Sequence, residues 1–264
     1  MIFRQLIDPE SFTYTYLLGD EATRRAVLID PVLEQIERDC ALLGELGLRL
    51  HCSLETHVHA DHITASGRLR ERLGAKVGAG ARAGVSNADW ALADGVTVCV
   101  GNVQLEVLAT PGHTAGCVTY LCREAGMAFT GDAMLVRGCG RTDFQDGDAG
   151  ALFRSVRERI FALADATLLY PAHDYSGRTV TSVAEEKRFN PRLHLGKTRE
   201  EFLAIMTGLR LPPPKRIAVA VPANQVSGLV ASASGGCEAA ARPVALAIEQ
   251  RGRQDAELLR GAGI

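Results

Sequence analysis

The chain has 264 residues, of which 47% are hydrophobic and 23% are charged, and its formal net charge is −2. This length and composition fit one large α/β domain, or one domain with a small appendage, and they exclude wholesale disorder. Nucleic-acid-binding proteins are usually basic, so we expect no nucleic-acid partner. No apolar run reaches the length of a membrane span, and the N-terminus has no targeting signal. We therefore expect a cytoplasmic protein without membrane contact.

The first half of the chain alternates expected strands and helices. Residues 12–18 alternate in hydropathy and residues 25–29 form a short apolar run, and both patterns are typical of strands. The next expected elements are a helix at 33–46, a strand at 50–56, a helix at 62–73 and a hairpin of 96–100 with 103–108.

The second half begins with strands and ends with helices. The expected strands are 117–122, 127–130 and 168–170, and the expected helices are 151–163, 181–188 and 199–209. This order suits two sheets with helices outside them, which is an αββα sandwich of the α/β class. The composition shifts to small residues near residue 230, so we divide the chain into a main domain at 1–229 and an appended tail at 230–264.

The densest chemical signal is the segment THVHADH at residues 56–62. Side chains two residues apart on an extended segment point the same way, so His57 and His59 can face one point in space. Asp61 and His62 follow where the chain turns into the next expected helix. Imidazole and carboxylate groups together suit zinc, iron or manganese.

Three further candidate ligands each follow an expected strand. They are His113 in PGHT, Asp132 in TGD and His173 in PAHD. Each residue alone is equally compatible with a structural role in a turn or a cap. Their occurrence together, in this order and each after a strand, predicts a metal site.

These motifs resemble those of a known superfamily. The HxHxDH segment with a later His, Asp and His is similar to the signature of the metallo-β-lactamase superfamily, which implies a metallo-β-lactamase-like fold. Within it the chain resembles the persulfide dioxygenases over most of residues 1–228. The segments that carry this resemblance are ETHVHADHITASGRL, ATPGHTAGCVTYL, FTGDAMLVRGCGRTDFQDGD, YPAHDYSGRTVTSV, EEKRFNPRL and AVPAN.

The spacing of the ligands does not determine whether the site holds one metal ion or two. All seven ligands of a binuclear site are present, so the spacing permits two zinc or iron ions bridged by Asp132. The resemblance implies one Fe(II) per chain instead, held by His57, His113 and Asp132 as a two-histidine, one-carboxylate triad. The remaining candidates would then support the ligands by hydrogen bonds: His59, Asp61, His62, His173, Asp174 and Thr130.

The resemblance also implies a reaction and a substrate. Glutathione persulfide and O2 would give sulfite and glutathione. Arg141 is the first candidate to bind the glutathione carboxylates, with an ion pair to Asp143 as the alternative. Tyr175 could reach the substrate or the metal, or pack as a loop aromatic. Arg216 and Lys215 could clamp a carboxylate, or remain solvated.

Two other functions compete with this interpretation. The first is a glyoxalase-II-like hydrolase of glutathione thioesters with two zinc or iron ions. The second is a metal- or sulfide-responsive binding protein, or a subunit that delivers persulfide to a partner enzyme. The complete ligand set argues against the second. The family resemblance further implies a homodimer or a higher homo-oligomer.

Overall fold

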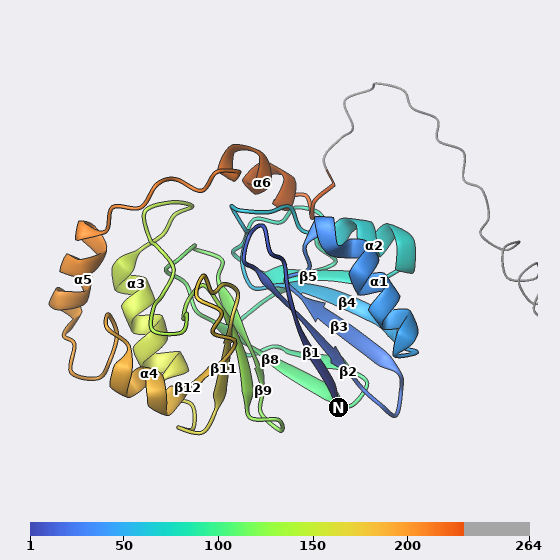
Figure 1. The fold of residues 1–264 in the computed structure, drawn as a ribbon, viewed down its shortest axis with the longest axis horizontal. Coiled ribbons are helices and arrows are strands. Elements are labelled where there is room, and N and C mark those ends of the chain that lie inside the picture. Colours follow the sequence, from blue (N-terminus) through green and yellow to red (C-terminus); the bar gives the residue numbers. More distant parts are fainter. Residues whose placement is uncertain (230–264) are drawn as a thin grey trace, which may run out of the picture. The chain divides into compact units, whose positions relative to one another are not determined.

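The computed structural model describes residues 1–229, so the tail at 230–264 lies outside the described residues. Two six-stranded sheets form the centre of the described part (Figure 1). The first sheet has the order β1 (Ile2–Ile7), β2 (Tyr14–Gly19), β3 (Arg25–Ile29), β4 (Arg49–Glu55), β5 (Lys76–Gly80) and β6 (Trp90–Leu92). The second has the order β12 (Thr181–Ser182), β11 (Leu168–Pro171), β10 (Met127–Gly131), β9 (Val118–Cys122), β8 (Val103–Ala109) and β7 (Thr97–Val100).

Each sheet combines parallel and antiparallel pairs. In the first sheet β1, β2 and β3 pair antiparallel, and β3 to β6 pair parallel. In the second sheet β10 and β11 are parallel and the other pairs are antiparallel. The parallel pairs β3–β4 and β10–β11 bring the carboxyl ends of neighbouring strands to the same sheet edge, and functional loops are often built at such edges.

Helices cover the outer face of each sheet (Figure 1). A 3-10 turn at Leu33–Gln35 leads into α1 (Ile36–Glu45), which lies with α2 (Ser66–Leu73) beside the first sheet. The helices beside the second sheet are α3 (Ala149–Arg154) with its π-helical continuation at Ser155–Ile160, α4 (Val183–Phe189) and α5 (Arg199–Gly208). The last helix, α6 (Ile217–Asn224), lies above the strand ends.

The core has three layers because side chains alternate along each strand. In β2, Tyr16 belongs to the buried cluster between the sheets, while Leu17 belongs to the cluster under α1 and α2. In β9, Tyr120 faces the other sheet and Leu121 packs with the helices that cover the second sheet. The Tyr16 and Phe129 rings join the two sheets at a centroid distance of 4.9 Å. These layers confirm the predicted αββα sandwich.

Several element boundaries differ from those predicted. The helix expected from residue 62 begins only at Ser66, because the preceding backbone is bonded elsewhere: Ala65 donates its N–H to the carbonyl of Pro31. The helix expected at 151–163 is α3 with its π-helical turn and ends at Ile160. Strands β5 and β6 and helix α6 were not predicted. The first two are short, and α6 contains Pro222, which normally indicates a helix end.

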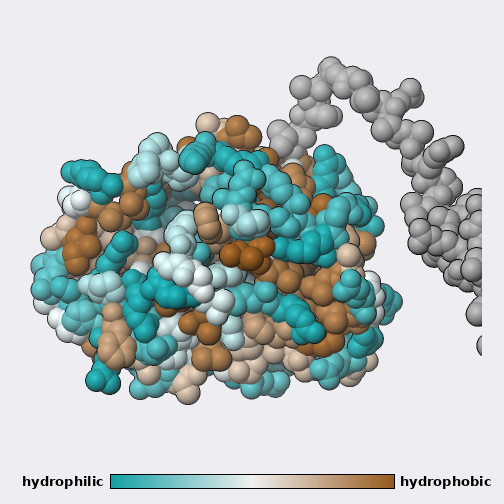
Figure 2. Space-filling model, viewed as in Figure 1, coloured by the Kyte–Doolittle hydropathy of each residue, from teal (hydrophilic) through white to brown (hydrophobic). Residues whose placement is uncertain are grey.

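None of the helices in residues 1–229 is both long enough and apolar enough to span a bilayer. The face drawn in Figure 2 mixes hydrophilic residues with small groups of hydrophobic ones, an ordinary distribution for a protein surface.

Candidate metal centre

Three loops at the strand ends bring together two histidines and one aspartate. His57 follows β4, His113 follows β8 and Asp132 follows β10 directly. One ligand atom from each lies within 4.8 Å of those from the other two. His57 is buried with 3% exposure, whereas His113 and Asp132 each leave 13% of the side chain accessible. The triad is therefore largely buried, and His113 and Asp132 are its two partly accessible members.

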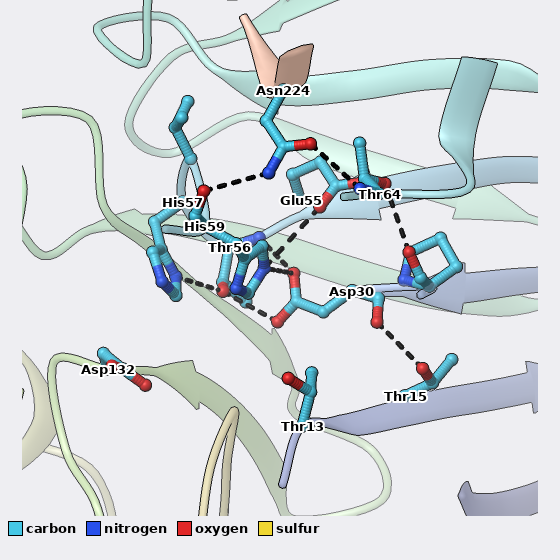
Figure 3. A network of polar contacts seen from close by, with 12 residues as sticks. Thr13, Thr15, Asp30, Glu55, Thr56, His57, His59, Thr64, Asp132 and Asn224 are labelled. Atoms are coloured by element: carbon cyan, nitrogen blue, oxygen red, sulfur yellow. Dashed lines mark hydrogen bonds and ion pairs between the residues drawn. The ribbon is translucent and has the colours of Figure 1, made fainter. Parts of the chain in front are cut away.

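Hydrogen bonds set the orientation of the His57 ring (Figure 3). The Thr56 hydroxyl donates to Asp30 Oδ2 at 2.8 Å, and Asp30 Oδ1 also accepts the Thr56 N–H at 2.7 Å. Because the Thr56 proton is used in this way, its Oγ1 accepts from His57 Nδ1 at 3.0 Å. The His57 Nε2 lone pair is then left for a metal ion. Burial, and next the neighbouring His59, hold the pKa of His57 well below its usual value, which favours the neutral ligand form.

A loop carbonyl orients His113 in the same manner. His113 Nδ1 donates to the backbone oxygen of Arg141 at 2.7 Å, and His113 Nε2 lies 3.7 Å from Asp132 Oδ2. Gly140 allows this close approach, because a Cβ at that position would lie 2.7 Å from both His113 Nδ1 and the carbonyl oxygen of Asp132. The loop after Asp132 thus holds the second histidine.

This close approach leads to a testable prediction. Gly140→Ala is expected to displace His113 and to lower metal affinity by about 10- to 100-fold, the range typical of disturbed ligand support. Gly138→Ala is the matched control in the same loop, because its Cβ would meet only Leu135 Cβ at 3.7 Å. Competition of each variant with a chelator measures the affinity. Equal affinities for the two variants would contradict the role of Gly140.

His173 connects Asp132 to Asp61. Its Nδ1 lies 2.7 Å from Asp132 Oδ1, and its Nε2 lies 3.1 Å from Asp61 Oδ2. Burial alone would lower the pKa of His173, but Asp132 and Asp61 raise it well above its usual value, so His173 is a buried cation in the metal-free protein. Burial alone would likewise raise the pKa of Asp132, but His173 and then His113 hold it well below the usual range. Asp132 is therefore an ionised carboxylate with Oδ2 directed toward His113.

A second group of possible ligands lies beside the triad: His59, Asp61, His62 and His173. The His59 ring is 4.0 Å from the His57 ring and 4.4 Å from the His62 ring, measured between centroids. Both nitrogens of His59 are buried without a hydrogen bond, although Nε2 lies 3.2 Å from Asp30 Oδ1. The structure thus brings all seven predicted ligands into two adjacent groups, with Asp132 and His173 in contact between them.

The last two residues predicted to support the ligands bond elsewhere. The Thr130 hydroxyl donates to the carbonyl oxygen of Met134 at 2.7 Å. Asp174 Oδ1 accepts the backbone N–H groups of Ser176 and Arg178 at 2.7 and 2.8 Å. These bonds organise the loops that follow β10 and β11, and they differ from the predicted contacts with the ligands.

Arg141, the first candidate for substrate binding, has its guanidinium engaged within the protein. It pairs with Asp143 at 2.6 and 2.8 Å and donates to the carbonyl oxygens of Leu211 and Pro212 at 3.1 and 2.7 Å. The alternative of an ion pair to Asp143 is therefore what the structure contains. Arg141 also anchors the segment between α5 and α6, which crosses the upper left of Figure 1 from one helix to the other.

The other substrate candidates differ in their surroundings. Arg216 forms an ion pair with Glu34 at 2.7 Å, and Lys215 is exposed. Tyr175 is 68% exposed, and its ring lies parallel to that of His173 with 6.2 Å between centroids. Its ring is also 5.5 Å from that of Phe12. Arg141 contacts a ligand through its backbone oxygen, which bonds to His113, and Tyr175 is the candidate whose side chain lies against a member of the two ligand groups.

Asn224 supports the histidine segment and was missed by sequence reasoning. Its Nδ2 donates to the carbonyl oxygens of His59 and His62 at 2.9 and 2.8 Å, and its Oδ1 accepts the Thr64 N–H at 2.9 Å. In Figure 3 Asn224 approaches this segment from one side, and Asp132 and Thr13 lie on the other. The AVPAN motif contains Asn224, but the motif alone indicated no contact.

Comparison with known proteins identifies the class that this fold and site define. The model of the metallo-beta-lactamase superfamily matches residues 8–173. Among curated relatives, the mitochondrial persulfide dioxygenase of Bos taurus is 53% identical over 229 residues, which cover 87% of this chain and 89% of the relative. The crystal structure of ETHE1 from Myxococcus xanthus is 58% identical, with a TM-score of 0.84, and the match covers 87% of this chain and all of that one.

The chain thus belongs to the persulfide dioxygenase family within the metallo-beta-lactamase superfamily. This result confirms the resemblance and the fold predicted from the motifs. A hydroxyacylglutathione hydrolase from Cereibacter sphaeroides is also similar, at 36% identity, but the match covers only 63% of this chain and 64% of the hydrolase. The hydrolase alternative therefore has the weaker support.

Proposed function

We propose that the protein is a persulfide dioxygenase that oxidises glutathione persulfide with O2 to sulfite and glutathione, using one Fe(II) per chain. The observation that carries this proposal is the triad of His57, His113 and Asp132, of which the last two are partly accessible. It occurs in a chain that matches a persulfide dioxygenase at 53% identity. Two histidines and one carboxylate with open positions are the donor set typical of non-haem iron oxygenases.

The side chains present fit such an ion. His57 and His113 each have one ring nitrogen bonded to the protein, which leaves Nε2 for the metal, and Asp132 offers Oδ2. Bound iron would supply redox chemistry and coordination positions for the persulfide sulfur and O2. His173 holds the other oxygen of Asp132, so that the carboxylate keeps one orientation.

We further propose that glutathione approaches from the side on which His113 and Asp132 are accessible. Tyr175 supports this direction, because its exposed ring stacks on that of His173. Lys215 and Arg216 follow the segment that Arg141 anchors. Exposed Lys215 offers positive charge for a glutathione carboxylate, and Arg216 would have to exchange Glu34 for one. Arg141 is proposed to shape this pocket by holding Leu211 and Pro212. The homo-oligomeric state stays a prediction.

The role of Arg141 can be measured through kinetics. Arg141→Ala is expected to raise KM for glutathione persulfide, by about tenfold for each 1.4 kcal/mol of lost binding, because the segment around Leu211 is released. Iron content should stay unchanged, since the bond to His113 comes from the Arg141 backbone. Asp143→Asn is the matched control: it weakens the ion pair but keeps the contacts with the two carbonyls, so KM should change less. An unchanged KM for Arg141→Ala would remove this residue from the pocket.

One experiment separates the proposed function from hydrolysis. The protein is purified without added metal, its iron and zinc are counted, and glutathione persulfide is added in an oxygen electrode. One iron per chain with O2 uptake and sulfite release is the expected result. Two metal ions per chain, no O2 uptake and hydrolysis of a glutathione thioester would overturn the proposal in favour of a glyoxalase-II-like enzyme.

A further inference from the structure

The Thr13 hydroxyl lies in the middle of the second group of possible ligands. Thr13 Oγ1 donates to Asp61 Oδ2 at 3.1 Å. It also lies 3.2 Å from His62 Nδ1 and 3.1 Å from His173 Nε2. Thr13 is completely buried, so these contacts are not made by a mobile surface group. One hydroxyl thus bonds to three of the four members of this group.

The backbone holds Thr13 in this place. Thr13 pairs with His173 in an isolated antiparallel bridge, immediately before β2. Its carbonyl oxygen accepts the N–H of Asp8 at 2.8 Å, and its hydroxyl also lies 2.8 Å from Ser11 Oγ. These backbone bonds to His173 and Asp8 fix the position of the Thr13 backbone and therefore of its hydroxyl.

Two of the groups that a second metal ion would need, Asp61 and His173, are already bonded to each other, whereas both nitrogens of His59 and Nε2 of His62 are buried without a hydrogen bond. Besides Thr13, Asp61 Oδ2 contacts His62 Nδ1 and His173 Nε2, both at 3.1 Å. Asp132 Oδ1, the carboxylate oxygen that does not face His113, lies 2.7 Å from His173 Nδ1. A metal ion at this group would have to break these bonds and accommodate the Thr13 oxygen in its coordination sphere.

The first group differs in this respect. Thr56 and the Arg141 carbonyl bond to the outward nitrogens of His57 and His113, and they leave the inward nitrogens for the metal. A hydrogen bond to the ring nitrogen that faces away from the metal strengthens a histidine as a ligand. A hydroxyl bonded to the nitrogen that would bind the metal competes with it. Thr13 contacts His62 at Nδ1 and leaves its Nε2 unbonded, as Thr56 does for His57. The two groups therefore differ at Asp61 Oδ2 and His173 Nε2, the two ligand atoms that the Thr13 hydroxyl contacts.

We propose that Thr13 closes the second metal position and thereby makes the centre mononuclear. This inference rests on the proposed function, since it explains why a chain with seven potential ligands would hold a single iron. Thr13 acts as a positioning residue: its hydroxyl keeps Asp61 and His173 hydrogen-bonded, so that these two ligands are not available to a second cation.

The test is a count of metal ions in Thr13 variants. Metal-free wild-type protein, Thr13→Ala and Thr13→Ser are equilibrated with excess Zn²⁺, freed of unbound metal, and analysed for zinc per chain. The wild type and Thr13→Ser, which keeps the hydroxyl, should hold one ion. Thr13→Ala should hold two, because the position becomes open. Ser11→Ala is the matched control: it removes a partner of Thr13 but keeps the Thr13 hydroxyl, so it should hold one ion.

The zinc counts test the role of Thr13 separately from the proposed dioxygenase function. One ion in Thr13→Ala would overturn the role of Thr13 and leave the proposed dioxygenase function intact. Two ions in the wild type would overturn both the role of Thr13 and the single-metal centre. If Thr13→Ala does not fold, His62→Ala provides a second measurement in an otherwise unchanged protein. Its ion count should equal that of the wild type, and a lower count would show that the second group binds metal and overturn the inference.

Discussion

Asp132→Ala is expected to abolish iron retention and O2 uptake, and His113→Ala is expected to do the same. Asp132 is the only anionic member of the triad, and its ionised form is favoured by His173 and His113. Without it, the two imidazoles of the triad remain without a carboxylate, and His173 loses its partner at 2.7 Å. Removing one partner of a buried charge pair is strongly destabilising, by about 3–5 kcal/mol. Iron per chain after gel filtration, with O2 uptake, is the measurement.

His62→Ala is the control for this prediction. His62 belongs to the second group and bonds to Thr13 and Asp61, so its loss should leave most of the iron in place. Circular dichroism of all three variants separates loss of metal from loss of fold. If His62→Ala loses iron as completely as Asp132→Ala, the assignment of a single metal to His57, His113 and Asp132 is wrong.

Asn224→Ala is expected to lower the free energy of unfolding by roughly 3 kcal/mol or more, since each buried polar group left without a partner costs about 1–3 kcal/mol. The substitution leaves three such groups: the carbonyls of His59 and His62 and the N–H of Thr64. The segment that carries His57 would lose its support, so iron retention should fall as well. Urea denaturation and iron analysis of the same preparation measure the two effects.

Asn87→Ala serves as the control for Asn224. Asn87 donates to the carbonyl oxygen of Val226 at 2.9 Å and accepts from Ser227, so it fastens the chain just after α6 without touching the histidine segment. A smaller loss of stability with normal iron content is expected for Asn87→Ala. If both variants lose iron equally, the effect comes from general docking of α6, and Asn224 has no specific role at the centre.

Two cysteines near the centre are packing residues, since Cys117 and Cys139 are both buried. Burial raises the pKa of the Cys117 thiol to about 12 and that of Cys139 to about 11. Neither thiol is therefore a nucleophile at neutral pH.

Residue order alone predicted the two sheets, their outer helices and the seven possible ligands. This was possible because strand and helix periodicity is local, and because the ligands each follow a strand and the strand ends of the two sheets meet at the same end of the sandwich. What it left open was the division of the ligands into two groups and the number of metal ions. It also left Arg141 with two alternatives, a substrate contact or an ion pair to Asp143, and the structure has the ion pair together with two bonds to the segment after α5.

Only the tertiary structure decided which distant residues complete the centre. Thr13 lies 160 positions from His173, and Asn224 lies 162 positions from His62, yet both pairs are in direct contact. No periodicity links residues so far apart, since their contact depends on how β2 and α6 pack against the strand ends. The sequence therefore determined the family, the fold and the set of ligands. The tertiary structure decided which hydrogen bonds these ligands receive, because only folding brings Thr13, Asp30 and Asn224 into contact with the histidine segment and the residues around it.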